Sequence, residues 1–258
     1  MSAPNSDGSD AGERLAAAFP ATPLSPRVAF ARLRDLEIRG VQLDATRPGL
    51  RPRELDRSAR RDLSATLARH GLTVAGLDLW IPPAHFAEPG RVDRAVASVD
   101  AALDLAADLG RPPVSVVLPP AGDATESVTL TLAGMAERRG VTLADHAVRV
   151  DADPGPPPAG VGIDPPAWLA QGADPIAAVT RWGEKCGVAR LCDLLSTGGR
   201  GPLGHADGQL DLLAYRVALE TSSFAGPFVI DPRGWTNPWA DLPACRRAWL
   251  AGAPGAAG

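Results

Sequence analysis

Short apolar runs alternate with longer amphipathic stretches along most of the chain. The apolar runs predict strands at residues 14–21, 40–45, 72–80, 113–119, 141–148, 161–164, 188–194 and 227–231. The stretches with apolar residues at helical spacing predict helices at 25–38, 53–71, 89–110, 124–140, 174–187, 208–222 and 238–252. Helix-starting and helix-ending residues support this division, since Ser25 and Asp174 each precede a proline and glycine ends the helices at 71 and 110.

This alternation predicts an α/β fold in which eight parallel strands close into a (β/α)8 TIM barrel. The run at 113–119 is continuously apolar, which is typical of a strand covered on both faces. A doubly wound open sheet is the rival fold. It is less favoured because no glycine-rich phosphate-binding turn follows any predicted strand.

One crossover departs from the pattern. Where a helix is expected between the fifth and sixth strands, residues 149–160 read RVDADPGPPPAG. Three adjacent prolines lack backbone N–H donors and are poorly tolerated inside a helix. We therefore expect this helix to be reduced or missing.

Charge and composition narrow the class of protein. We expect one barrel domain at 13–252, a disordered tail at 1–12 and a flexible tail at 253–258. The net charge of -4 argues against nucleic acid as a partner, and the longest apolar run is too short for a membrane span. The N-terminus has no apolar signal-peptide core, and the three cysteines form no CxxC pattern. These features favour a cytoplasmic protein with free thiols.

Polar residues stand at the ends of most predicted strands, where a TIM barrel places its active site. They are Asp44, Asp78, Trp80, Asp145, His146, Asp164, Arg190, Asp193, Asp231 and Arg233, and loops add His85, Arg200 and His205. Some have a structural interpretation: Asp44 and Asp78 as helix or turn caps, Trp80 as packing at the rim, His85 and His205 as surface or turn residues. Asp164, Arg190 and Asp231 each end an apolar strand, where an unpaired charge is costly to bury, so they predict a shared site.

Three segments resemble the xylose isomerase-like TIM barrels, which include sugar isomerases, ketose 3-epimerases and endonuclease IV. The segments read VGIDPPAWLAQGADP from 161, VARLCDLLSTGGRGPLGHADGQLD from 188 and GPFVID from 226. Gly172, Asp174 and Pro175 match the family's Gly-x-Asp-Pro helix start, and Arg200 and Gly204 match its Arg-x-x-x-Gly loop. The resemblance spans roughly residues 25–250.

The resemblance also implies that the metal site is degenerate. The family's ligand positions fall here on His146 (or Asp145, one residue away), Asp164, Arg190 and Asp231, and its substrate-binding histidine falls on Ala167. A guanidinium has no lone pair to offer a metal ion. We therefore expect no tightly bound cofactor. If a divalent metal (Mn, Mg or Zn) is present, its ligands should include Asp164 and Asp231.

The resemblance implies a sugar or sugar phosphate isomerase or epimerase, which moves a proton next to a carbonyl group. Asp231 is then the expected base, with His146 and Asp164 as the other catalytic candidates and Arg190 or Arg200 stabilising the oxyanion. The alternative is a non-catalytic barrel that binds a sugar-like or anionic small molecule. Endonuclease activity is set aside because the chain is acidic and has only four histidines.

The expected ligand is a polyhydroxy compound, bound with help from Trp80 and His85. Arg190, Arg200 and Arg233 are expected at the mouth of the barrel. If Asp164 pairs with one arginine and Asp193 with another, the third is left for an anionic group. This predicts preference for an acidic or phosphorylated ligand, unless structural ion pairs occupy all three arginines. The sequence does not specify an oligomeric state.

Overall fold

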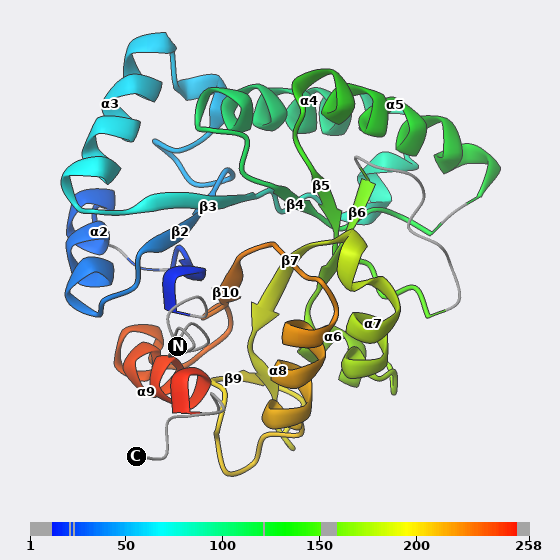
Figure 1. The fold of residues 1–258 in the computed structure, drawn as a ribbon. Coiled ribbons are helices and arrows are strands. Elements are labelled where there is room, and N and C mark those ends of the chain that lie inside the picture. Colours follow the sequence, from blue (N-terminus) through cyan, green and yellow to red (C-terminus); the bar gives the residue numbers. More distant parts are fainter. Residues whose placement is uncertain (1–11, 21, 23, 121, 151–158, 252–258) are drawn as a thin grey trace, which may run out of the picture.

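The computed structural model describes residues 12–20, 22, 24–120, 122–150 and 159–251. Eight strands form a closed barrel, in the order β1–β10–β7–β6–β5–β4–β3–β2, and every neighbouring pair is parallel (Figure 1). The strands are β1 (Leu15–Ala18), β2 (Gly40–Asp44), β3 (Thr73–Asp78), β4 (Val114–Val116), β5 (Leu143–Asp145), β6 (Ala159–Ile163), β7 (Cys186–Leu191) and β10 (Phe228–Ile230). The predicted (β/α)8 barrel is therefore confirmed.

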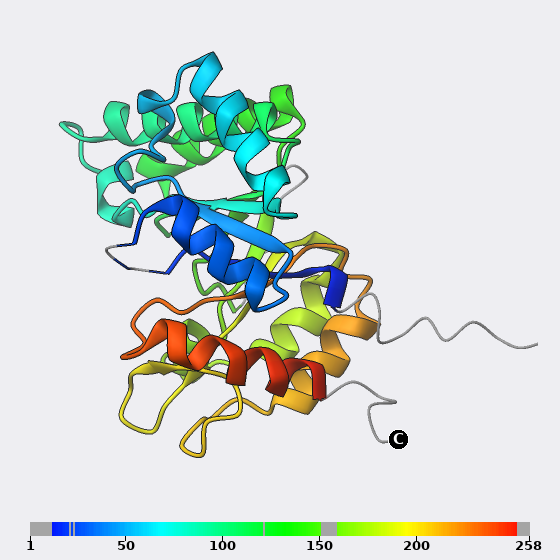
Figure 2. The same cartoon turned by 90° about the vertical axis from the view of Figure 1, so that its left-hand side faces the viewer.

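Helices surround the barrel on its outside (Figures 1 and 2). They are α2 (Pro26–Asp35), α3 (Arg57–Arg69), α4 (Val92–Asp108), α5 (Asp123–Arg139), α6 (Pro165–Leu169), α7 (Pro175–Trp182), α8 (Leu212–Thr221) and α9 (Pro238–Ala251). Short 3-10 turns, η1 (Pro52–Glu54), η2 (Pro83–Phe86) and η3 (Gly183–Lys185), lie in the connections. Asp174 caps α7 as predicted, since its carboxylate accepts a hydrogen bond from the Ile176 amide.

The predicted strand at 188–194 is wrong in its second half. The barrel strand β7 ends at Leu191, and the chain then leaves the barrel as a small antiparallel hairpin. The hairpin pairs β8 (Asp193–Leu194) with β9 (Arg200–Gly201). Both halves of the run are buried, so hydrophobicity alone does not show where the chain turns away.

Small side chains fill the part of the barrel interior that lies below the carboxyl ends of the strands. Ala16, Ala18, Ala144, Val188 and Val229 form one cluster, separate from the large core between strands and helices. Because side chains alternate along a strand, the residues two positions further on also point inward, toward the carboxyl ends of the strands. The sequence thus places small residues deep in the barrel and polar residues near the carboxyl ends of the strands.

Several predictions concern residues outside those described. The reduced helix between β5 and β6 falls mostly on residues 151–158, and the two tails fall on 1–11 and 252–258, so these remain predictions. Within the described chain, no helix has the length and apolar character needed to span a membrane. Cys186, Cys192 and Cys245 are free thiols, as expected, and all three are buried.

Candidate active site at the barrel mouth

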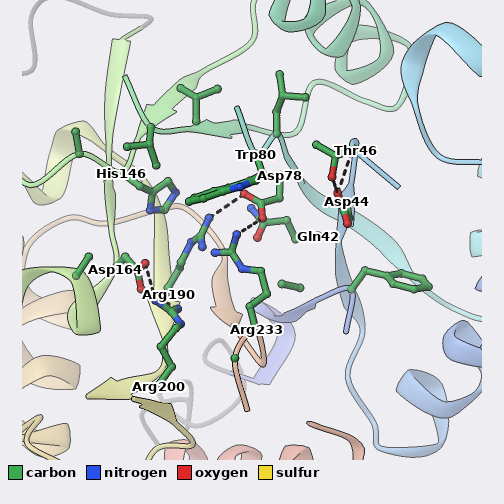
Figure 3. A pocket seen from close by; sticks show the side chains of 18 of the residues that line it. Gln42, Asp44, Thr46, Asp78, Trp80, His146, Asp164, Arg190, Arg200 and Arg233 are labelled. Atoms are coloured by element: carbon green, nitrogen blue, oxygen red, sulfur yellow. Dashed lines mark hydrogen bonds and ion pairs between the residues drawn. The ribbon is translucent and has the colours of Figure 1, made fainter. Parts of the chain in front are cut away.

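A cavity of about 630 Å³ opens at the carboxyl ends of the strands, and we call it the central cavity. Strand alternation brings its polar residues there: Arg190 lies two positions after Val188, and His146 two positions after Ala144. Its polar and aromatic lining comprises Phe19, Gln42, Asp44, Thr46, Asp78, Trp80, His146, Asp164, Gln171, Arg190, Arg200 and Arg233, most of which are labelled in Figure 3. Residues far apart in the sequence therefore meet in one site.

Three arginines and three aspartates form a closed network of ion pairs, which we call the arginine–aspartate cluster: Arg190, Arg200, Arg233, Asp78, Asp164 and Asp231. Arg190 donates from Nη1 to Asp231 at 2.7 Å and from Nη2 to Asp78 at 2.9 Å. Its side chain is only 4% exposed, so this buried charge depends on both partners.

The other two arginines complete the network from the hairpin strand β9 and from the loop after β10. Arg200, on β9, binds Asp164 through two nitrogens at 3.0 Å each and reaches Asp231 at 2.7 Å. Arg233, just after β10, donates to both oxygens of Asp231 at 2.8 and 2.6 Å and to Asp78 at 2.6 Å. Three positive charges thus face three negative charges, and the cluster is neutral as a whole.

Asp231 is the carboxylate that all three guanidiniums share. It is fully buried, it accepts hydrogen bonds from all three arginines, and it is not among the residues that line the central cavity. Burial raises the pKa of Asp231 to about 6, although Arg190 and Arg200 oppose the rise. Asp231 is thus joined to Arg190 and, through Arg200, to Asp164, but the structure gives a substrate no direct path to this expected base.

Asp164 is also held in an ion pair, in this case with Arg200. Burial alone would raise the pKa of Asp164, but the Arg200 and Arg190 guanidiniums outweigh it, and the pKa falls below its usual value. The carboxylate is therefore ionised and held by a bidentate arginine pair. The Pro-Pro-Ala segment that follows it starts α6, and Ala167 lines the cavity where the family resemblance implied a histidine.

Asp193 does not pair with an arginine, so that expectation is wrong. Its Oδ1 accepts hydrogen bonds from the Gln209 and Leu210 amides at 3.0 and 2.8 Å, and it does not line the central cavity. The chain leaves the barrel after Leu191, which turns this side chain toward the loop beyond the hairpin. The inferred unpaired third arginine is wrong as well, because Asp78 takes the partner role that had been given to Asp193.

His146, rather than Asp145, faces the central cavity. Its Nε2 lies 3.0 Å from the hydroxyl of Ser115, which accepts a hydrogen bond from Gln42 Nε2 at 2.9 Å. The ring lies against Gly162, where a Cβ atom would overlap it. Burial lowers the pKa of His146 well below its usual value, and Arg190 adds to this effect, so the imidazole is neutral at pH 7.

Asp145 has a structural role instead. Its Oδ1 accepts hydrogen bonds from the Leu118 and Ala147 amides, and its Oδ2 pairs with Arg149. These contacts tie the ends of β4 and β5 together. The one-residue ambiguity at this strand end is therefore resolved in favour of His146 as the residue in the site.

Asp44 is a site residue whose role sequence reasoning left open. Its Oδ1 accepts from the Thr46 amide at 2.8 Å and from the Thr46 hydroxyl at 2.5 Å, so it does cap a turn. It also lines the central cavity, and no described residue donates to its Oδ2. A cap uses only one carboxylate oxygen, which leaves the other available. Its position at a strand end was the available signal.

Of the two aromatic ligand-binding candidates, Trp80 lines the central cavity and His85 does not. Trp80 lines the central cavity and is 61% exposed, so its ring is open to a ligand. His85 lies outside the central cavity, with its Nε2 2.8 Å from Arg91 Nη1. His205 accepts from the Asp207 amide at 3.2 Å, which agrees with its interpretation as a turn residue.

The donor set does not fit a divalent metal ion. The aspartates of the cluster already accept hydrogen bonds from guanidiniums, and an added cation would meet three fixed positive charges. Among the described residues, no group of three or more His, Cys, Asp or Glu is arranged to hold a metal. Guanidiniums, rather than a set of metal ligands, surround these carboxylates.

Comparison with known proteins agrees with this fold. The family model for xylose isomerase-like TIM barrels matches residues 30–249, and the chain belongs to that family. An L-ribulose 3-epimerase structure is similar with a TM-score of 0.73 and 18% identity, over 92% of this chain and 93% of the other. A xylose isomerase domain protein from Planctomyces limnophilus has a TM-score of 0.72 and 18% identity, over 92% and 96% of the two chains.

A third similar structure is the IolI protein with a bound zinc atom, with a TM-score of 0.68 and 14% identity over 93% of this chain and 99% of that one. No curated protein sequence matches the chain. At these identities the structures establish the fold alone. The chemistry must be argued from the residues of this chain.

Proposed function

We propose that this protein isomerises or epimerises a sugar-like polyhydroxy carbonyl compound, and that it does so without a metal. The observation that carries the proposal is the arginine–aspartate cluster in the central cavity, with Asp44 and His146 outside its ion pairs. Membership of the family and likeness to an epimerase structure support this class of reaction.

The guanidiniums can bind the oxygens of such a compound. A guanidinium has five N–H donors, of which Arg190 uses two, and Arg200 and Arg233 three each, within the cluster. Apart from the buried Nε–H groups of Arg190 and Arg200, the remaining N–H groups can donate to hydroxyl and carbonyl oxygens of a ligand. The aspartates hold the guanidiniums in place, so the positive charge is preorganised for an enediolate oxygen.

Asp44 is the proposed base in place of Asp231. Its carboxylate takes the proton from the carbon next to the carbonyl, the C–H electrons form the carbon–carbon double bond, and the negative charge moves to the oxygen beside the guanidiniums. Figure 3 shows Asp44 and His146 on opposite sides of Arg190 and Arg233. If Asp44 returns the proton to the neighbouring carbon, and the hydroxyl proton passes between the two oxygens, the product is an isomer. If a second group delivers a proton to the opposite face of the original carbon, the product is an epimer.

His146 is the proposed second proton-exchanging group. A neutral imidazole can donate a hydrogen bond to a carbonyl oxygen and can pass a proton between neighbouring oxygens. Ser115 and Gln42 fix its orientation, and Gly162 leaves room for its ring. In this scheme Asp164 and Asp231 position arginines and do not exchange protons with the substrate.

The second candidate is a non-catalytic barrel that binds the same compounds. It is favoured by one observation, which is that both aspartates expected to be catalytic are engaged in ion pairs. Binding would then use the same guanidinium N–H groups without a proton transfer. The two candidates differ in whether the C–H bond next to the carbonyl is broken.

Hydrogen exchange at carbon separates the two candidates. Chelator-treated protein is incubated in deuterium oxide with D-fructose, L-ribulose and their phosphate esters, and NMR follows loss of the proton next to the carbonyl. An isomerase exchanges this proton, and Asp44→Asn should slow the exchange about 100-fold or more while calorimetric affinity stays nearly unchanged.

The control is Asp35→Asn on α2, which should leave exchange unchanged. This aspartate is exposed and, among the described residues, pairs with Arg34 alone. Binding without exchange across the panel would favour the non-catalytic barrel. Exchange that survives Asp44→Asn unaltered would remove Asp44 from the proposed role.

A further inference from the structure

A second cavity of about 510 Å³ lies beside the central cavity, and we call it the arginine cavity. The two share Thr46, Leu79 and Trp80 in their linings, so they form neighbouring parts of one depression. The arginine cavity is walled by η1, by the loop and η2 after β3, and by the start of α4. None of these segments contributes to the arginine–aspartate cluster.

The charged side chains that line the arginine cavity are all of positive sign. Its lining includes Arg51, Arg53, Arg91 and Arg94, and no described lining residue is an aspartate or glutamate. In the central cavity the three arginines of the cluster are matched by three aspartates. An anion entering the mouth therefore meets neutralised guanidiniums on one side and a basic wall on the other.

Two of the four arginines have partners at the rim. Arg51 donates to the Thr46 carbonyl at 2.7 Å and pairs with Glu54 at 3.1 Å. Arg91 pairs with Glu88 at 3.1 Å and lies 2.8 Å from His85 Nε2. Their side chains are about one third and one half exposed, so these ion pairs are weak and open to competition.

The other two arginines lack close partners. Arg94 makes no ion pair or side-chain hydrogen bond with any described residue, and Arg53 interacts only electrostatically, with Glu54. Both are exposed. Arg91 and Arg94 also lie at the N-terminal end of α4, where positive charge opposes the helix dipole. A local arrangement that is unfavourable in the free protein is typical of a functional surface.

We propose that the arginine cavity binds the phosphate group of a substrate whose polyhydroxy carbonyl part occupies the central cavity. Guanidinium forks match phosphate oxygens in geometry and charge. Trp80 belongs to both linings and is the exposed one among the six tryptophans, so its ring can contact the carbon skeleton between the two groups. The inference rests on the proposed function for the identity of the sugar part only.

The test compares D-fructose, D-fructose 6-phosphate and inorganic phosphate by calorimetry and ³¹P NMR. The wild-type protein should bind the phosphorylated sugar at least about tenfold more tightly than the free sugar, and this gap should shrink with added salt. The double variant Arg53→Gln/Arg94→Gln should remove most of the gap and leave binding of D-fructose unchanged. The matched control is Arg61→Gln, an exposed arginine on α3 outside both cavities.

Each outcome has one meaning. Equal affinity for the two sugars in the wild-type protein, or a gap that the double variant leaves intact, overturns the proposal. If neither sugar binds, inorganic phosphate decides: binding lost in the double variant supports the phosphate site, and no phosphate binding refutes it. A protein that binds phosphate through these arginines but exchanges no proton at carbon keeps this inference while the proposed reaction fails.

Discussion

Arginine has two different roles at the mouth of this barrel. In the arginine–aspartate cluster, guanidiniums are buried or half-buried and are bonded to fully buried Asp231 and its neighbours at 2.6–3.0 Å. In the arginine cavity, Arg53 and Arg94 are exposed, and no carboxylate in the described part of the chain bonds to them. The same side chain therefore holds a scaffold together in one cavity and is available to a ligand in the other. The two groups of arginines differ in how deeply they are buried and in whether an aspartate lies within bonding distance.

The sharpest way to test this difference is to remove the shared anion of the cluster. Asp231→Leu leaves buried Arg190 with one of its two partners and deprives Arg200 and Arg233 as well. We expect a loss of about 3–5 kcal/mol in the free energy of unfolding, because an uncompensated buried charge is costly. Urea unfolding followed by circular dichroism measures it.

The control for this prediction comes from the other cavity. Arg53→Gln should change the free energy of unfolding by less than about 0.5 kcal/mol, since an exposed charge without a close partner contributes little. If Asp231→Leu costs no more than Arg53→Gln, the cluster is not the scaffold described above.

Substitution of a glycine beside the cluster is expected to give the next largest loss of stability. Gly162→Ala places a Cβ atom where the His146 ring lies, and the ring must move away from Ser115. We expect destabilisation of about 1–3 kcal/mol, as for other overpacked interiors. Thermal unfolding compares it with Gly90→Ala, where no atom lies within 4 Å of the added Cβ. Equal melting temperatures for the two variants would show that the ring is not confined.

The burial of His146 also predicts a dependence of stability on pH. Its pKa is lowered in the folded protein, so between pH 6.5 and that lower value the unfolded chain binds the proton and the folded protein does not. Stability should therefore fall as the pH drops below about 6.5, with a slope approaching about 1.4 kcal/mol per pH unit from this group.

His146→Asn should remove that slope, and the difference between the two proteins isolates it. The raised pKa of Asp231 contributes a slope of opposite sign below pH 6, but it is present in both proteins. Urea unfolding at pH 5.5, 6.5 and 7.5 measures the difference. Parallel curves for wild type and variant would mean that His146 takes up its proton in the folded state.

The sequence predicted the framework well and the ion pairing poorly. Alternating hydrophobicity was enough for the barrel, and strand ends were enough to bring His146, Asp164, Arg190 and Asp231 to one site. Pairing depends on where loops turn, and no periodicity shows that the chain leaves the barrel after Leu191. Asp78 and Asp193 looked alike as strand ends, but one joins the cluster and the other binds backbone amides.

The arginine cavity was missed for a related reason. Its arginines lie in two surface stretches where charged residues are ordinary, and nothing in the sequence brings the pair Arg51 and Arg53 next to the pair Arg91 and Arg94. The fold brings η1 and the start of α4 together, so that both line one depression. A preference for anionic ligands was expected from Arg190, Arg200 and Arg233. Because these three are paired with aspartates, we propose the arginines of the other cavity as its basis.

The smallest predicted effect has the opposite sign to the largest. Arg94 lies in the first turn of α4 and pairs with no residue that the structure describes, so its charge opposes the helix dipole without compensation. Arg94→Gln should therefore stabilise the free protein by about 0.3–0.5 kcal/mol at low salt, and the gain should fade in 1 M salt because the interaction is screened. Arg138→Gln, at the C-terminal end of α5, is the matched control and should destabilise slightly. Urea unfolding at both salt concentrations measures the two variants, and a clear loss of stability on replacing Arg94 would mean that this arginine serves the fold and is not held free for a ligand.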